Sequence, residues 1–333
     1  MKLQIFLTGL LTGLLLSPAS GSAADEISYY GYDRAIELKN DAVRVVLCPQ
    51  VGGRVLEYSL NGNNVLYLSD AEKKWRPGDR PQSSAGRFDI GPELVIPRRS
   101  VLWSGAWDAE ITGERSARLT SQVCPETGVR LIRDFELDAQ TTRLRCTQTI
   151  VNASDGVREW CHWSRTFAVG KGVCVIPLTS EQAGPISRFP NGYVMYEDRA
   201  LINMKPTDPN IRRIDDSLLI FPTPRRPKLG FDSYHGTIAY FAPNNLLFVK
   251  KFRTFPDGVY NEAAGLTISV WYPDNEMVEL EPIGPRQRLK PGQSGSFTEV
   301  WWLAEADFPG TELTDISELQ TAVQKFPDVR NDR

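Results

Sequence analysis

The chain has 333 residues, of which 41% are hydrophobic and 24% charged, with 38 Lys and Arg against 41 Asp and Glu. This balance excludes a largely disordered chain, which would be poor in apolar residues and would carry a high net charge. A formal net charge of −3 also argues against a dedicated nucleic-acid-binding protein, because such proteins use excess basic residues to neutralise phosphates. All-β domains often reach this length undivided.

The first 24 residues have the order of a secretory signal peptide. Lys2 precedes an apolar run from Leu3 to Leu16, and the small residues Ser22, Ala23 and Ala24 follow. The run is too short to cross a bilayer comfortably, which takes about 20 apolar residues. We therefore expect cleavage near Ala24 and an exported, periplasmic or extracellular protein that does not contact the membrane after cleavage.

The rest of the chain predicts short β-strands rich in Val, Ile, Thr and aromatic residues. The expected strands are Val43–Cys48, Arg54–Leu60, Val129–Leu137, Arg143–Val151, Trp160–Val169, Thr237–Phe241, Leu246–Phe252, Leu266–Tyr272 and Met277–Pro282. Turn-forming pairs such as Asn61-Gly62 lie between them. Because no long helical pattern alternates with these strands, we expect a large antiparallel β-sandwich.

Apolar residues recur at helical spacing from Leu313 to Phe326 and predict one short C-terminal helix. The expected organisation is therefore a signal peptide at 1–24, a β-sandwich at 25–310, and a helix and tail at 311–333. Two stretches, 75–107 and 205–228, show no clear periodicity and are predicted to be long irregular loops.

The cysteine and histidine content gives no sign of a metal centre. The five cysteines form no CxxC pair and are best interpreted as buried thiols, although export would permit a disulfide. They are Cys48, Cys124, Cys146, Cys161 and Cys174, and the sequence does not choose a pairing among them. With two histidines and no clustered Cys and His spacing, we expect no bound metal and no cofactor.

Alternation along two predicted strands indicates which side chains share a face of the sheet. Glu279 and Glu281 alternate with apolar residues, and Trp160 and His162 share a face opposite to Trp163. We expect the face with His, Glu and Trp160 to point outward, where a concave sheet would turn it into a groove.

Three groups of motifs, in this order along the chain, carry a family resemblance. They are Val51–Leu56 with Asn61–Leu66, then Gln148–Asn152 with Trp160–Phe167, then Glu279–Pro282 with Leu289–Gln293 and Glu299–Trp301. In this order they resemble the galactose mutarotase-like superfamily, and in particular its exported branch, domain of unknown function 4380. The resemblance covers about Tyr32 to Leu303 and implies a β-supersandwich with a sugar-binding concave face.

The resemblance also implies a chemistry. In mutarotases a Glu takes the proton of the anomeric hydroxyl and a His protonates the ring oxygen, so that the sugar opens and recloses. The matching residues here are Glu281 as the base and His162 as the acid. The chain departs from the family pattern because the region that holds a second mutarotase His, here Arg87–Glu93, contains none.

Further residues are candidates for substrate binding. An Arg can clamp a carboxylate through paired donors, and a Trp can stack on the apolar face of a pyranose. The candidates are Arg54, Asp89, Glu93, Arg98, Trp103, Trp107, Trp160 and Glu279. The expected ligand is a mono- or oligosaccharide, neutral or acidic.

Three functions remain open on the sequence. The first is an epimerase-like isomerase, the second a glycan-binding module without catalysis, and the third a polysaccharide hydrolase or lyase accessory enzyme. The sequence does not decide whether the protein is catalytic, which sugar it takes, whether a metal helps to hold that sugar, or its oligomeric state.

Overall fold

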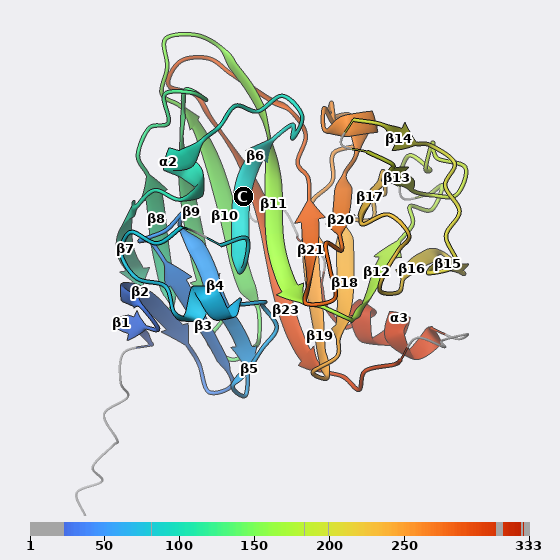
Figure 1. The fold of residues 1–333 in the computed structure, drawn as a ribbon, viewed down its shortest axis with the longest axis horizontal. Coiled ribbons are helices and arrows are strands. Elements are labelled where there is room, and N and C mark those ends of the chain that lie inside the picture. The colour runs from blue at the N-terminus through green and yellow to red at the C-terminus, as the bar shows by residue number, and fades with distance from the viewer. Residues whose placement is uncertain are drawn as a thin grey trace, which may run out of the picture.

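The computed structural model describes residues 23–80, 82–182, 184–198, 200–310, 316–327 and 329. Most of the predicted signal peptide therefore lies outside the described residues. Within them, two large antiparallel sheets pack face to face, with few and short helices (Figure 1). This confirms the predicted antiparallel sandwich.

We call the 13-stranded sheet, which faces the viewer in Figure 1, sheet A, and the 10-stranded sheet behind it sheet B. Sheet A has the order β1 (Ala24–Tyr29), β2 (Tyr32–Lys39), β3 (Val43–Cys48), β4 (Arg54–Leu60), β6 (Gly86–Gly91), β11 (Arg158–Val169), β21 (Met277–Pro282), β20 (Ile268–Trp271), β17 (Lys228–Phe231), β13 (Val194–Tyr196) and β14 (Ile202–Asn203), with β5 (Asn63–Asn64) beside β4 and β22 (Gln287–Leu289) beside β11.

Sheet B has the order β15 (Ile211–Ile214), β16 (Ser217–Ile220), β12 (Val173–Pro177), β18 (Thr237–Ala242), β19 (Leu246–Phe252), β23 (Ser294–Glu305), β10 (Leu144–Asn152), β9 (Val129–Leu137), β8 (Ser116–Ser121) and β7 (Trp107–Gly113). The short helices are α1 (Asp70–Lys73), α2 (Ser100–Trp103), the 3-10 turn η1 (Ala263–Gly265) and α3 (Ser317–Gln324).

Several predicted strands form with the expected bounds, among them β3, β4, β9, β19 and β21. The predicted turn between β4 and β5 is also confirmed. Asn61 and Gly62 have φ values of 51° and 79°, and Leu60 pairs with Asn63. Positive φ at both central residues is the requirement of a type I′ hairpin, which favours the Asn-Gly pair.

The two stretches predicted to be irregular are only partly so, and that prediction was wrong for three strands. Stretch 75–107 contains β6 in the middle of sheet A. Stretch 205–228 contains the β15–β16 hairpin at the edge of sheet B, with all four residues of β16 buried. Prolines that flank these strands hid them, because Pro lowers the strand signal of the residues around it.

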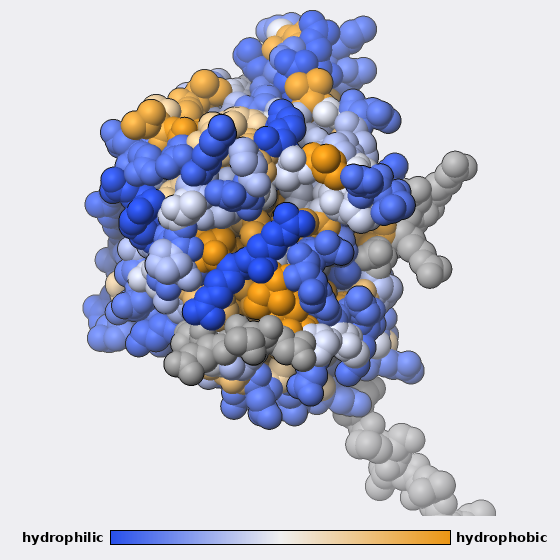
Figure 2. Space-filling view, turned by 90° about the vertical axis from the view of Figure 1, so that its right-hand side faces the viewer, coloured by the Kyte–Doolittle hydropathy of each residue, from blue (hydrophilic) through white to orange (hydrophobic). Residues whose placement is uncertain are grey.

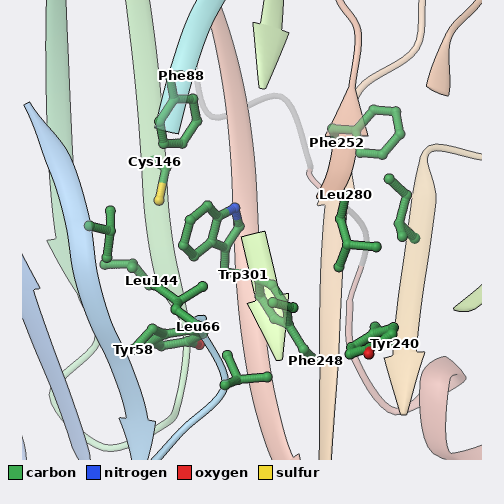
Figure 3. Packing of buried hydrophobic residues seen from close by; sticks show 14 of the residues in the cluster. Tyr58, Leu66, Phe88, Leu144, Cys146, Tyr240, Phe248, Phe252, Leu280 and Trp301 are labelled. Atoms are coloured by element: carbon green, nitrogen blue, oxygen red, sulfur yellow. The ribbon is translucent and has the colours of Figure 1, made fainter. Parts of the chain in front are cut away.

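Aromatic and aliphatic side chains fill the space between the sheets, as Figure 3 shows. Trp301 of β23 is fully buried, lies parallel to Phe88 at a centroid distance of 5.8 Å, and meets Phe248 edge-on at 5.4 Å. All five cysteines are buried free thiols, as expected. We call the side of each sheet that faces this core its inner face, and the opposite side its outer face.

The predicted C-terminal helix is present as α3 over Ser317–Gln324, which packs on the outer face of sheet B, while Leu313 of the predicted helix lies outside the described residues. Val323 contributes to that apolar cluster, and Phe326 lies 5.4 Å from Trp302 between ring centroids. Figure 2 looks onto this end of the molecule and shows hydrophobic side chains in its middle, bordered by hydrophilic ones. No helix in the described parts of the chain is long and apolar enough to cross a membrane.

Candidate functional site

The outer face of sheet A gathers charged side chains from neighbouring strands. Val278 and Leu280 of β21 enter the central core, so the alternating Glu279 and Glu281 lie on the outer face, as the sequence predicted. Both carboxylates are nevertheless fully buried, because loops and neighbouring side chains cover this part of the sheet. Buried charges of this kind require partners.

Arg165 of β11 lies between two buried acidic residues, Glu279 of β21 and Asp89 of β6. Its Nε donates to Glu279 Oε1 at 2.7 Å, and its Nη1 lies 3.9 Å from Asp89 Oδ2. Asp89 in turn accepts two hydrogen bonds from Arg99, at 2.7 Å from Nε and 2.5 Å from Nη2. These guanidinium groups hold the pKa of the buried Asp89 below its usual range, against the effect of its desolvation.

A second group of charges lies around Lys228 of β17. Its Nζ is 2.5 Å from Glu93 Oε2 and 3.7 Å from Glu281 Oε2. The backbone N–H of Glu93 donates to Glu262 Oε2 at 2.8 Å. The lysine therefore neutralises part of a cluster in which acidic residues outnumber it.

Glu281 is the acidic residue whose protonation is most changed by this environment. Trp163 Nε1 donates to its Oε2 at 2.7 Å, while its Oε1 has no hydrogen-bond partner among the described residues. Burial raises the pKa of Glu281 to about 7, with Lys228 lowering it and Glu279 raising it. A carboxyl group with such a pKa can act as acid or base near neutral pH.

Arg165 also borders an open hollow on the outer face, with a volume of about 430 Å³. The hollow is lined by Arg80, Ser83, Arg98, Arg99, Ser100, Trp103, Ser104 and Arg165. Two of these, Arg98 and Trp103, were predicted as binding residues from the sequence. The polar lining with one indole is suited to a hydroxylated ligand.

Trp103 is held in the hollow wall by two guanidinium groups. The Arg87 Cζ atom lies 4.1 Å and the Arg165 Cζ atom 4.8 Å from the Trp103 ring centroid. Arg87 also donates from Nη1 to the Trp103 carbonyl at 2.8 Å and from Nη2 to the Gln82 carbonyl at 2.7 Å. Arg87 thereby ties together the two loops that line the hollow.

The prediction that His162 and Glu281 face the same groove is wrong. His162 is 1% exposed and stacks on Phe297 of sheet B, with 5.7 Å between the ring centroids, so it lies on the inner face. Its neighbour Trp163 points the opposite way, to Glu281. Burial lowers the pKa of His162 to about 3, so the imidazole is neutral at physiological pH. No proton relay through one sugar can join these two groups across the sheet.

Three other predicted binding residues serve the fold instead. Arg54 is fully buried and donates to both carboxylate oxygens of Glu72 at 2.7 Å. Trp107 belongs to the central core, with the Arg133 Cζ atom 4.3 Å from its ring centroid. Trp160 packs against the same core and donates to the Thr127 carbonyl at 3.1 Å. None of the three lines the hollow.

The structure thus brings Asp89, Glu93, Glu279 and Glu281 into one charged face, with Arg98 and Trp103 in the adjoining hollow. Sequence reasoning missed Arg165 and Lys228. Strand alternation could have found Arg165, which lies two residues after Trp163 and so on its face. Nothing in the sequence around Lys228 indicates that β17 brings it to Glu281, because the two are far apart in the chain.

Comparison with protein-family models and with curated proteins found no match. Solved structures are similar to the chain at low identity. They include the Slr1438 protein of Synechocystis sp. PCC 6803 (16% identity, 84% of this chain and 99% of that one, TM-score 0.56). A galactose mutarotase-like protein of Lactobacillus casei has 11% identity over 81% of this chain and 100% of that one, with a TM-score of 0.58. Another galactose mutarotase-like protein, of Clostridium acetobutylicum, has 12% identity over 85% of this chain and 98% of that one, with a TM-score of 0.55. The chain therefore shares the galactose mutarotase-like fold.

Proposed function

We propose that this protein binds a carbohydrate on the outer face of sheet A, in the hollow lined by Trp103 and the arginines around it. The observation that carries the proposal is the pair of buried carboxylates behind the hollow. Asp89 orients Arg99, and Glu279 orients Arg165, so two planar sets of N–H donors are fixed beside an indole. Fixed donors and an aromatic wall are the elements with which proteins recognise hydroxylated rings.

The fold supports the same function. Structures with this fold include proteins described as galactose mutarotase-like, which points to sugars as the ligand class. We also propose that the chain belongs to the exported branch of that superfamily and acts outside the cytoplasm, as the charged, apolar and small-residue order of residues 1–24 predicts. Fractionation of cells that express the full chain tests export directly.

Glycan binding by the purified protein tests the proposed function. We expect Trp103→Ala to weaken binding at least tenfold, with Trp103→Phe retaining part of the affinity. Tyr30→Ala is the matched control, because Tyr30 is 55% exposed and lines a different hollow of about 970 Å³ with Tyr29 and Tyr67. Loss of binding in Tyr30→Ala with full binding in Trp103→Ala would move the site to that other hollow.

An epimerase-like reaction is a second candidate, favoured by one observation. Glu281 has a pKa of about 7 and lies next to the Trp163 indole that Arg165 also contacts. NMR measurement of anomer interconversion with a panel of aldoses tests this candidate. Acceleration that is lost in Glu281→Gln and kept in His162→Leu would establish Glu281 chemistry without the imidazole; no acceleration with any bound sugar would leave a glycan-binding protein.

A further inference from the structure

We infer that the hollow beside Trp103 recognises a negatively charged group on the sugar, either a carboxylate, a sulfate or a phosphate. The inference rests on the proposed function, since it concerns the same hollow, and it specifies the ligand class. The charges that line the hollow support it, because the lining contains arginines and no acidic residue.

The lining is unusually basic for this chain. Four of the eight residues around the hollow are arginines and none of the eight is acidic, whereas the whole chain has a formal net charge of −3. A concave surface that gathers one sign of charge attracts ligands of the opposite sign. A binding site for neutral sugars has no need for this concentration of guanidinium groups.

Two of the arginines are oriented but retain free donors. Arg99 points its Nε and Nη2 at Asp89, and its Nη1 makes a long contact of 3.4 Å with the Pro97 carbonyl. Arg165 uses Nε and Nη2 for Glu279, while its Nη1 makes no hydrogen bond within the described part of the chain. A guanidinium carries five N–H donors, so each group can bind an oxyanion while its carboxylate holds it in place.

The other two arginines have no carboxylate in direct contact, and Arg98 interacts with Glu126 only at longer range. Arg80 and Arg98 are exposed, and neither forms an ion pair with a residue that the structure describes; the Arg98 Nε donates to Ser100 Oγ at 3.2 Å. Behind the hollow wall, the buried Arg87 is held by backbone carbonyls rather than by a carboxylate.

These observations divide the arginines by role. Arg99 and Arg165 are positioned by buried acidic residues and give the site its shape. Arg80 and Arg98 are exposed and supply charge that no carboxylate of the described residues contacts directly. Removing the second pair should therefore remove most of the preference for anions without disturbing the fold.

The experiment compares the protein with Arg80→Gln/Arg98→Gln by calorimetry. The matched control is Arg130→Gln/Arg213→Gln, which removes two exposed arginines of sheet B. The ligands are glucose, galactose, glucuronic acid, galacturonic acid, glucose 6-sulfate and glucose 6-phosphate, each measured at 50 and 500 mM NaCl, with inorganic sulfate and phosphate alone.

We expect at least one charged sugar to bind at least tenfold more tightly than its neutral parent, which is the effect of one charge-assisted hydrogen bond. The double variant should lose most of this preference and the control should keep it, and 500 mM NaCl should reduce it. Which acid binds best identifies the charged group.

Equal binding of neutral and charged sugars, or an unchanged preference in Arg80→Gln/Arg98→Gln, would overturn the inference and leave sugar binding intact. Binding of inorganic sulfate or phosphate as tightly as of any sugar would overturn it too, since the sugar would then contribute nothing. Failure of every sugar to bind would contradict the proposed function itself.

Discussion

The two faces of strand β11 use buried polar residues in different ways. On the inner face, His162, Ser164 and Thr166 point to sheet B, and Lys250 donates to both hydroxyl groups at 2.9 Å. On the outer face, Trp163 and Arg165 point to the charged cluster and its hollow. The same strand therefore joins the two sheets with one set of side chains and borders the candidate site with the other.

The difference between the faces lies in how completely their charges are matched. Lys250 is enclosed: Glu299 Oε2 lies 3.1 Å from its Nζ, and Leu280 accepts a further hydrogen bond through its carbonyl at 3.0 Å. Arg165 pairs with Glu279 and, at 3.9 Å, with Asp89, but it also borders an open hollow in which its Nη1 makes no hydrogen bond within the described part of the chain. An enclosed and fully hydrogen-bonded charge such as Lys250 stabilises the fold, whereas a paired charge that still borders an open hollow can also contact a ligand.

The largest expected effect comes from breaking the inner ion pair. Lys250→Met leaves the buried Glu299 carboxylate without its cation, and we expect the free energy of unfolding to fall by about 3–5 kcal/mol. Urea denaturation measures the loss. The double variant Lys250→Met/Glu299→Gln removes the unpaired charge, and it should recover a large part of the stability; no recovery would contradict the assigned pairing.

On the outer face, Glu281 should make stability fall as the pH rises. Its pKa is raised from 4.5 to about 7, so the folded protein holds a proton that the unfolded chain releases between these values. The resulting loss by pH 8 is on the order of 3 kcal/mol. Because His162 acts in the opposite direction below pH 6.5, the quantity to measure is the difference between the two proteins: the stability of the native protein relative to Glu281→Gln should fall by about this amount from pH 4 to 8. Parallel curves for the two proteins would argue against a raised pKa.

On the inner face, His162 should act with the opposite sign. Its pKa is lowered from 6.5 to about 3, so stability is lost as the pH falls below 6.5, when the unfolded chain takes up a proton that the folded chain does not. At pH 5 this loss is about 2 kcal/mol. Relative to His162→Leu, the native protein should therefore lose about this amount of stability between pH 7 and 5, and the two proteins should bind sugar equally well. If a normally folded variant lost sugar binding, the His162 imidazole would have to take part in binding.

The smallest expected effect concerns the β4–β5 turn. Gly62 has a φ of 79° and open space around its Cβ position, so Gly62→Ala is opposed by backbone strain alone. We expect a loss of about 1 kcal/mol in thermal unfolding, with no change in binding. A larger loss would mean that the turn makes contacts that the structure does not show.

Much of the sandwich could be predicted because strand composition and Asn-Gly turns are local signals. Which face of each strand points to the core could not be predicted in the same way. Alternation separates His162 from Trp163, but it does not say which of the two points to the core. Polar residues such as Lys250 and Glu299 occupy the inner face because they satisfy each other across the core. A single strand does not reveal that partnership, and the expected facing of β11 was reversed.

The candidate site was predicted in part for the same reason. Glu279 and Glu281 alternate with apolar residues whose burial is unambiguous, so their face was assigned correctly. Arg54 belonged to a family-like motif, and its burial with Glu72 depends on a chain contact that spacing does not show. The basic hollow needs Arg80, Arg98 and Arg165 from three separate segments, which only the folded chain brings together.

A crystal structure of the protein with the sugar that binds it most tightly tests the central claim most directly. Our account places that sugar on the outer face of sheet A, against Trp103 and within hydrogen-bonding distance of Arg165, with His162 still sealed between the sheets. A sugar bound in the hollow of Tyr29 and Tyr67, or one in contact with the His162 imidazole, would contradict it.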